Sequence, residues 1–248
     1  MLVPATVRLH LGEVELEGET AVPSGQVTLE EMLPAFRAVA QALVHLGVAA
    51  SGKQVSCAKG CAACCRMAIP VSEPEAHRLR AVVDAMPEPR RSAVRARFSA
   101  GMDLFHATGL LDGMFQRDEG DEAERRARTN LESYYAKFVA CPFLEDESCS
   151  IYDERPLVCR GFLVTSPAAN CANIDGAGVQ RLPIFARSGD ALILIASKPG
   201  SSRTASMPLI QLLEWTDRNS DDGDRRTGPE WLGMFTEMLQ TEASNVGN

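Results

Sequence analysis

The sequence predicts a mostly α-helical fold with small β elements, in which a helical scaffold carries a cysteine-rich loop region. Two observations support this prediction. Apolar residues recur at three- and four-residue steps in several segments, as they do on the buried face of a helix. Eight cysteines lie in segments that lack such periodicity. With 248 residues, 45% of them hydrophobic, the chain is long enough to bury a sizeable core.

The N-terminal segment has the pattern of a strand pair. Apolar and polar residues alternate over residues 6–20, with Gly12-Glu13 as the expected turn. Pro23-Ser24-Gly25 then ends the second strand, because proline and glycine interrupt regular strand pairing. We therefore expect an N-terminal β-hairpin.

A helix is expected directly after the hairpin. Thr28 and Glu31 have the spacing of a capping box, in which two side chains satisfy the first free N–H groups of a helix. Pro34 would then lie inside the helix, so we expect either a kink or a start near Leu33-Pro34. The predicted buried stripe comprises Leu29, Met32, Leu33, Phe36, Val39, Leu43 and Leu46.

Three more helices are expected between residues 72 and 139. The first begins at Ser72, whose Ser-x-x-Glu pattern with Glu75 predicts a second capping box. The third ends before Cys141-Pro142. The predicted buried faces contain Leu79, Val82, Val83 and Met86 in the first helix, Val94, Phe98, Met102 and Phe105 in the second, and Ala127, Leu131, Tyr134, Tyr135 and Phe138 in the third.

The C-terminal part mixes both kinds of element. Residues 181–198 are predicted to form strands around a Ser188-Gly189-Asp190 turn, and helices are predicted over Leu209–Trp215 and Trp231–Leu239. Residues 220–228 form a charged connector. We divide the chain into an N-terminal hairpin and helix (1–50), a cysteine-cluster metal-binding domain (51–175) and a C-terminal α/β extension packed on the same core (176–248).

Composition and charge exclude several classes of protein. The formal net charge of −8 disfavours a general nucleic-acid binder, which is normally basic. Met1–Gly12 lacks the basic flank and long apolar run of a secretory signal, and the most apolar later run, Ala191–Ala196, is too short to span a bilayer. We expect a cytoplasmic protein without a nucleic-acid or membrane partner. The basic run of Arg90, Arg91, Arg95 and Arg97 is interpreted as a solvated helix face, with a docking surface for an acidic protein partner as the second interpretation.

Four cysteines lie within nine residues, which is the most informative feature of the chain. They are Cys57, Cys61, Cys64 and Cys65. A Cys-x2-Cys step lets two sulfurs meet one metal, and Gly60 permits a tight turn beside the ligands. Neighbouring side chains point apart, so the pair Cys64-Cys65 would more naturally supply two metal ions, or two metals of one cluster.

The second group of cysteines is more widely spaced and suits loops that fold back over a site. It comprises Cys141, Cys149, Cys159 and Cys171. Four residues beside the thiols are candidates for supporting roles. Arg66, Arg155 and Arg160 could lower thiol pKa values and donate hydrogen bonds to sulfur, and Tyr152 could donate one from its hydroxyl group.

Three interpretations of the thiols compete, and a metal site is favoured. A reducing cytosol disfavours disulfides, so clustered cysteines there more often bind metal or act in catalysis. Metal-free redox dithiols and inert buried cysteines are the alternatives. Thiolate ligands suit zinc, an iron–sulfur cluster or Cu(I), and disfavour Mg²⁺ and Ca²⁺. Two four-cysteine zinc sites would use all eight thiols, whereas one four-iron cluster needs four.

The arrangement of these motifs resembles the YkgJ-type cysteine-cluster family, a zinc- or iron-chelating domain with a CxxCxxCC motif. The resemblance covers about residues 52–172. It implies that zinc or iron, or an iron–sulfur cluster, is bound by the eight cysteines. The matching pieces are Gly60-Cys61-Ala62-Ala63-Cys64-Cys65-Arg66, Cys141-Pro142-Phe143-Leu144, Cys149-Ser150-Ile151-Tyr152 and Arg155-Pro156-Leu157-Val158-Cys159-Arg160.

The resemblance also admits an enzyme. Enzymes that methylate flagellin lysines look similar in their cysteine cluster, which implies a protein-lysine methyltransferase or an oxidoreductase as the alternative function. Cys57, Cys61 and Cys64 also fit the Cys-x3-Cys-x2-Cys spacing of a radical enzyme that uses S-adenosylmethionine. Neither the metal nor a substrate follows from spacing alone.

Overall fold

A computed structural model of the protein describes residues 1–12, 14–107, 121–137, 139–173, 176–197, 205–221 and 223–246. This part of the chain is mostly helical, with four two-stranded pairings, as the sequence predicts. Its helices are α1 (Leu29–Ser51), α2 (Glu73–Asp84), α3 (Arg90–His106), α4 (Asp121–Ala136), α5 (Leu157–Gly161), α6 (Ser188–Ala196), α7 (Leu212–Arg218) and α8 (Gly228–Val246). Short 3-10 turns are η1 (Ala63–Arg66), η2 (Tyr152–Glu154), η3 (Ala168–Ala172) and η4 (Leu209–Gln211). The strands are β1 (Leu2–Leu11), β2 (Val14–Pro23), β3 (Gln26–Val27), β4 (Pro70–Ser72), β5 (Leu144–Glu145), β6 (Ser148–Cys149), β7 (Ser206–Pro208) and β8 (Arg226–Thr227).

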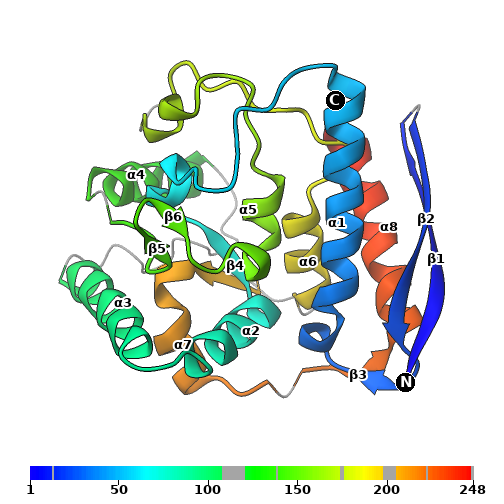
Figure 1. The fold of residues 1–248 in the computed structure, drawn as a ribbon, viewed down its shortest axis with the longest axis horizontal. Helices are drawn as coiled ribbons and strands as arrows, with labels where there is room; N and C mark the ends of the chain where they lie inside the picture. The colour runs from blue at the N-terminus through cyan, green and yellow to red at the C-terminus, as the bar shows by residue number, and fades with distance from the viewer. Residues whose placement is uncertain are drawn as a thin grey trace.

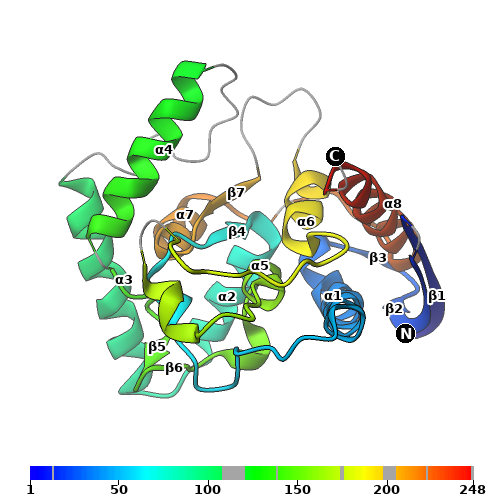
Figure 2. The ribbon, with the colours of Figure 1, turned by 90° about the horizontal axis from the view of Figure 1, so that it is seen from above.

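The helices and strands pack into two hydrophobic cores. The first contains residues of the β1–β2 hairpin, α1, α5, α6 and α8. The second contains residues of α2, α3, α4, α7 and the β4–β7 pair. Figures 1 and 2 show the hairpin and α8 at one end of the molecule and α3 and α4 at the other. The predicted segment boundaries at residues 50 and 175 stay a prediction.

The N-terminal hairpin is the antiparallel pair expected from the alternating pattern. Strands β1 and β2 pair in register from Leu2 opposite Pro23 to Leu11 opposite Val14. Val7, Leu9 and Leu11 alternate with exposed residues and are buried. Gly12 has a φ of +70° at the turn, a conformation that glycine adopts without strain. Its expected turn neighbour Glu13 lies outside the described residues.

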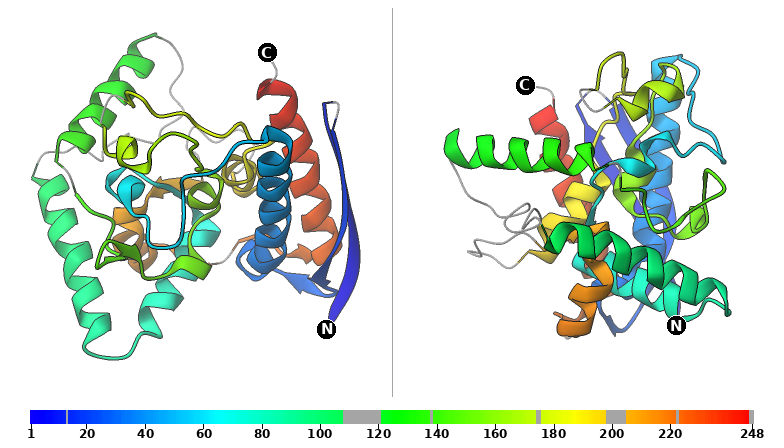
Figure 3. Two further views of the ribbon diagram at one scale, coloured as in Figure 1. Left: turned by 45° about the horizontal axis from the view of Figure 1, so that its top comes forward. Right: turned by 90° about the vertical axis from the view of Figure 1, so that its left-hand side faces the viewer.

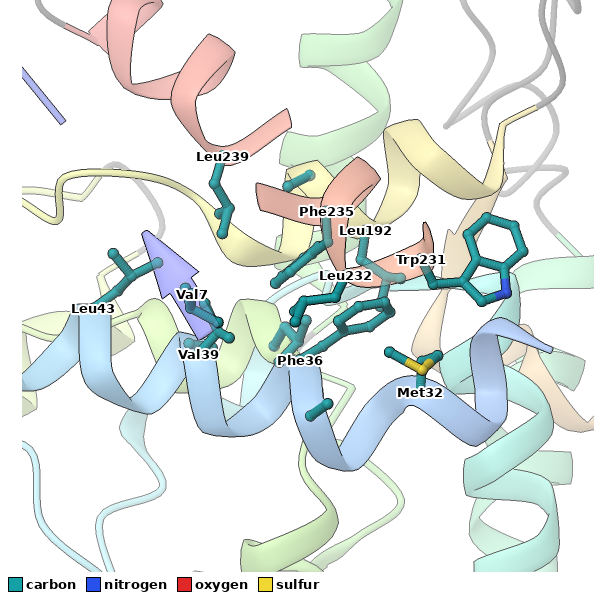
Figure 4. Packing of buried hydrophobic residues seen from close by; sticks show 14 of the residues in the cluster. Val7, Met32, Phe36, Val39, Leu43, Leu192, Trp231, Leu232, Phe235 and Leu239 are labelled. Carbon is teal, nitrogen blue, oxygen red and sulfur yellow. The ribbon is translucent and has the colours of Figure 1, made fainter. Parts of the chain in front are cut away.

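Helix α1 is the central helix of the first core. It begins at Leu29 behind the predicted capping box, in which Thr28 Oγ1 accepts from the N–H of Glu31, so Pro34 lies inside the helix. The ring of Phe36 packs against that of Phe235 with centroids 4.3 Å apart (Figure 4). By length and composition alone α1 could cross a membrane, a criterion that a buried core helix also meets. The absence of a membrane partner therefore stays a prediction.

The second core confirms the predicted helical faces of α2 and α3. Ser72 and Glu75 form the expected capping box at the start of α2. Val94, Phe98, Met102 and Phe105 are all buried along α3. The ring of Phe105 stacks on that of Tyr134 of α4, with centroids 4.6 Å apart. The predicted third helix is α4, which ends at Ala136, whereas Phe138 lies outside the described residues.

The strands predicted over residues 181–198 are wrong. Residues 182–187 form no strand, and Arg181 makes only an isolated antiparallel bridge with Val164. Residues 188–196 form α6, with Asp190 in its first turn, and Lys198 lies outside the described residues. A short apolar run does not distinguish a buried strand from a buried helix. Ala191 and Leu192 are buried in the first core, where α6 packs against α5 and α8. Packing against these helices therefore decides the conformation.

The cysteine-bearing segments lie over the second core. The chain leaves α1 and runs across the molecule to η1, as Figure 3 shows. Residues 141–171 form short elements, β5, β6, η2, α5 and η3, joined by loops, as expected. Cys141 and Cys149 pack against the second core, and Phe143 and Ile151 are buried in it.

Candidate metal centre

The first cysteine group lies on two consecutive tight turns. Gly60 has a φ of +92°, and the N–H of Cys61 donates to the carbonyl of Ala58 at 3.0 Å. The N–H of Cys65 then donates to the carbonyl of Ala62 at 2.9 Å, which begins η1. Only a residue without Cβ adopts the Gly60 conformation freely, so the glycine gives this loop its curl as predicted.

Backbone hydrogen bonds join the first cysteine group to the second. The N–H of Cys141 donates to the carbonyl of Cys65 at 2.7 Å. The N–H of Ser56 donates to the carbonyl of Val164 at 2.9 Å, and the N–H of Val164 returns to Cys57 Sγ at 3.4 Å. η1 also lies against η3, which carries Cys171. The two groups are therefore neighbours in space although they are far apart in sequence.

Cys149 ends a short hairpin that follows Cys141. Leu144 of β5 pairs with Cys149 of β6. The connecting residues Asp146 and Glu147 both have positive φ, as a two-residue hairpin turn requires. The N–H of Ser150 then donates to the carbonyl of Phe143 at 2.9 Å, which closes this loop.

Cys159 lies on α5, whose first residue is fixed by a buried carboxylate. Glu75 Oε1 accepts a hydrogen bond of 2.7 Å from the N–H of Leu157. Its Oε2 accepts from the N–H and the hydroxyl of Ser72 at 3.1 and 2.7 Å. Glu75 is 2% exposed. The carboxylate that caps α2 therefore also holds the start of the helix that carries Cys159.

A second carboxylate fixes the turn before α5. The Glu154 carboxylate forms ion pairs with Arg37 of α1, at 2.6 Å, and with Arg78 of α2, at 2.5 Å. The guanidinium groups of Arg78 and then Arg37 lower the pKa of Glu154 to about 2, against the opposing effect of burial. One helix from each core therefore supplies an arginine that anchors the segment between Cys149 and Cys159.

Electrostatic interactions separate the thiols into two sets around Cys64. Burial raises the pKa of Cys171, and the thiolates of Cys64, Cys57 and Cys61 raise it further. The pKa of Cys159 is raised by burial and then by Cys141, Cys64 and, more weakly, Cys149. Cys64 thus interacts with both sets, and a side-chain hydrogen bond with Cys65 is the first cause of its own raised pKa.

The sulfurs do not surround a single point in this structure. Within the described part of the chain, no three His, Cys, Asp or Glu side chains are placed so that they could hold one ion. All eight cysteines are free thiols, of which Cys171 is buried and the others are half-buried. Backbone hydrogen bonds thus bring the cysteine-bearing segments together without placing three sulfurs around one ion.

Comparison with known proteins identifies the cysteine-bearing segment. Residues 56–175, a little under half of the chain, match the family model CxxCxxCC, described as "Putative zinc- or iron-chelating domain". This segment is a CxxCxxCC domain. No curated protein and no solved structure matches the chain. The metal-chelating character predicted from the cysteines is therefore supported at the level of the family description.

The CxxCxxCC domain directs backbone N–H groups at three of its sulfurs. Cys57 accepts from Val164, and backbone hydrogen bonds from Phe143 and Ile151 act on Cys141 and Cys149. Burial still raises the pKa of Cys141 to about 12, with the Phe143 N–H acting in the opposite direction. Such N–H donors stabilise the negative charge of a metal-bound thiolate. The donor set therefore fits a thiophilic metal.

Two buried guanidinium nitrogens point to the same conclusion. The Nε atoms of Arg155 and Arg97 are buried and have no hydrogen-bond partner. Arg155 interacts electrostatically with Cys57, Cys64 and Cys149. Arg97 interacts in the same way with Cys141. The positive charge of each guanidinium favours the thiolate form of these cysteines, so both residues suit a metal-loaded site.

Arg97 is a residue whose position sequence reasoning missed. The run from Arg90 to Arg97 is interpreted as a solvated helix face. The Arg97 side chain is 38% exposed, but its Nε atom is buried and the residue pairs with Glu145 of β5 at 2.7 Å. Arg95, two residues earlier, pairs instead with Asp84 on the exposed side. Helical periodicity could have predicted this position, because Arg97 lies next to the buried Phe98 and three residues after the buried Val94.

The other predicted supporting residues have distinct positions. Arg66 pairs with Glu147 at 2.7 and 3.1 Å and interacts electrostatically with Cys65. Tyr152 lies under the guanidinium of Arg155, 4.0 Å from its ring centroid. Arg160 donates to the carbonyls of Arg155, at 3.1 Å, and Asp153. Tyr152 and Arg160 thus hold Arg155 and its loop, while their predicted role toward the metal stays a prediction.

Proposed function

We propose that the CxxCxxCC domain binds zinc or iron through the thiolates of its eight cysteines. The observation that supports this proposal most is the junction at η1, where the N–H of Cys141 bonds to the carbonyl of Cys65. It places both cysteine groups beside one turn, although the two positions are far apart in the sequence. A packed core gains nothing from such a concentration of thiols, whereas zinc and iron prefer sulfur ligands.

Two sets of four thiols are the arrangement that the electrostatic interactions among the thiols favour. Cys57, Cys61 and Cys171 would form one set with one member of the vicinal pair. Cys141, Cys149 and Cys159 would form the other set with the second member. Each member of the pair would then serve a different metal, as expected of adjacent side chains that point apart.

In the absence of a cation, ionised thiolates at this site are unfavourable. A bound metal would neutralise their charge. Without a cation, burial and neighbouring thiolates favour the protonated thiols. Metal binding would release these protons. Arg155 and Arg97 would then donate their unpaired Nε–H groups toward sulfur, and the N–H groups of Val164, Phe143 and Ile151 would do the same.

Elemental analysis of the full chain tests this proposal. The protein should be purified without oxygen and without chelator, and its visible absorption spectrum recorded on the same sample. We expect zinc or iron in stoichiometric amount. Colourless protein with zinc indicates thiolate-bound zinc, and broad visible absorption with iron indicates an iron–sulfur cluster. The proposal would be refuted if the chain purified without metal and its stability did not change when zinc or iron was added.

A cluster-containing enzyme is the second candidate function, and one observation favours it. A cavity of about 460 Å³ borders Cys171, so a small molecule would have access to the thiol site. Saturable binding of S-adenosylmethionine would support a methyltransferase, and a reversible redox signal would support an oxidoreductase. A zinc-loaded chain that shows neither would eliminate this candidate.

A further inference from the structure

The cavity beside Cys171 has the size of a small-molecule site. Its volume is about 460 Å³, within the range of ligand pockets. Met67 lies just after η1, Tyr135 belongs to α4, and Phe162 follows α5. Arg181 comes from the segment after η3. Four separate parts of the chain therefore form one cavity at the edge of the cysteine site.

The charge of this cavity is opposite to that of the chain. Its described lining contains two arginines, Arg66 and Arg181, and no aspartate or glutamate, whereas the chain has a formal net charge of −8. Arg66 is already paired with Glu147. Within the described residues, Arg181 has no carboxylate partner. A guanidinium at a cavity whose described lining holds no carboxylate favours an anionic ligand.

Arg181 is held in place by the cavity walls. Its guanidinium stacks on the ring of Phe162, 4.7 Å from the centroid. Tyr135 lines the same cavity; burial raises the pKa of its hydroxyl group, and the positive charge of Arg181 opposes that shift. Stacking leaves the N–H edge of a guanidinium available for a planar, two-oxygen acceptor.

The rest of the lining is mostly apolar or small. Ala63, Met67, Phe162 and Val179 offer no charged group, and the exposed part of the lining is more apolar than polar. Methionine and phenylalanine side chains pack well against a flat hydrocarbon or aromatic group. A ligand with one charged end and one apolar body matches this division.

We propose that this cavity binds a small organic carboxylate, with the carboxylate on Arg181 and an apolar or aromatic body between Met67 and Phe162. The bound molecule would lie against Cys171. This inference rests on the proposed function only in that Cys171 is there a metal ligand. The carboxylate site itself needs no metal, so the two proposals can fail independently.

Ligand-observed saturation-transfer NMR on the full chain tests the proposal. The probes are benzoate, its neutral analogue benzamide, and acetate, which has the charge without the apolar body. The variant is Arg181→Gln, and the matched control is Arg8→Gln, which removes an arginine from the distant β1 strand. Metal content is measured on every sample, because loss of metal would report on the thiol site separately.

We expect saturable benzoate binding to the unaltered chain and to Arg8→Gln. Arg181→Gln should weaken this binding about tenfold, the effect of losing one charge-assisted contact. Benzamide lacks the negative charge and acetate lacks the apolar body, so each should bind about tenfold more weakly than benzoate. Absence of saturable benzoate binding, equal binding of benzamide, or equal binding by Arg181→Gln would overturn the proposal. Saturable benzoate binding by a chain that purifies without metal would support the carboxylate site while the metal measurement counts separately against the metal proposal.

Discussion

The backbone N–H of Cys141 donates a 2.7 Å hydrogen bond to the carbonyl oxygen of Cys65. This bond connects the last residue of the first cysteine group to the first residue of the second. Because it uses backbone atoms, it leaves both sulfurs available as ligands. The hydrogen bond that joins the two cysteine groups therefore does not depend on a metal. The cysteines of each group can be substituted and tested separately.

The two thiol sets predict a partial loss of metal from single variants. Cys171→Ser belongs to one set and Cys159→Ser to the other. Because serine is a poor ligand for zinc or iron, each variant should retain about half of the metal, and the double variant almost none, if each set holds its own ion. Elemental analysis of the three proteins measures this. Complete loss in either single variant would instead indicate one shared cluster.

Arg97 is predicted to support the metal through its unpaired Nε–H. Arg97→Lys keeps the positive charge near Glu145 but removes the guanidinium. We expect metal affinity to fall about tenfold, as is typical when a hydrogen bond to a ligand is lost. Competition with a metal-binding dye measures the affinity. Arg95→Lys, on the exposed side of the same helix, is the control and should bind metal normally; equal affinity in both variants would remove Arg97 from the site.

Glu75→Ala should destabilise α5 and the Cys159 site together. The substitution leaves the buried N–H groups of Leu157 and Ser72 without acceptors, at a cost of about 1–3 kcal/mol each. Urea unfolding measures the total loss. Glu230→Ala is a close control, since Glu230 forms the same capping box with Thr227 on an exposed surface where water replaces it. An equal loss in the two variants would show that the contact with Leu157 does not matter.

The anchor at Glu154 should make stability fall in acid. The pKa of Glu154 is about 2 in the folded chain, below its ordinary value of 4.5, so the folded state holds this carboxylate ionised. The resulting stabilisation is present above pH 4.5 and is lost as the pH falls toward 2. Because Arg78 is partly exposed, we expect about 1–2 kcal/mol rather than the full value of the shift.

Glu154→Gln tests this dependence. The free energy of unfolding of the variant should be lower than that of the unaltered chain near neutral pH, and the difference should shrink in acid. Glu147→Gln removes an exposed carboxylate that pairs with Arg66 and is the control. A difference for Glu154→Gln that stays constant from neutral to acidic pH would contradict the assigned pKa.

Gly189→Ala should destabilise the contact between α6 and α5. An added Cβ would meet Val158 Cγ2 at 2.3 Å and Val158 N at 3.0 Å, and such overpacking costs about 1–3 kcal/mol. Gly233→Ala in α8 is the matched control, because nothing lies within 4 Å of its added Cβ. There the helical preference of alanine should stabilise the chain by about 0.5–1 kcal/mol. Stabilisation by both substitutions would show that α5 and α6 do not pack so closely.

Features that depend on neighbouring residues could be predicted from the amino-acid sequence. The capping boxes at Thr28 and Ser72 follow from spacings of three residues, and the buried face of α3 follows from helical periodicity. Gly60 and the density of cysteines around it indicated a tight turn and a thiol site in the same way. These features could be predicted because the interactions that cause them span only a few residues.

Features that depend on distant partners could not be predicted in this way and became visible in the folded chain. Residues 188–196 became α6 because α5 and α8 bury their apolar side chains, which periodicity over nine residues cannot foresee. Arg97 pairs with Glu145 because β5 supplies this carboxylate beside α3, and its charge thereby acts on Cys141. The grouping of thiols around Cys64 depends on hydrogen bonds between segments about a hundred residues apart, such as that from Val164 to Cys57. The order of cysteines along the chain does not contain this information, because loops of very different length can bring the same residues together.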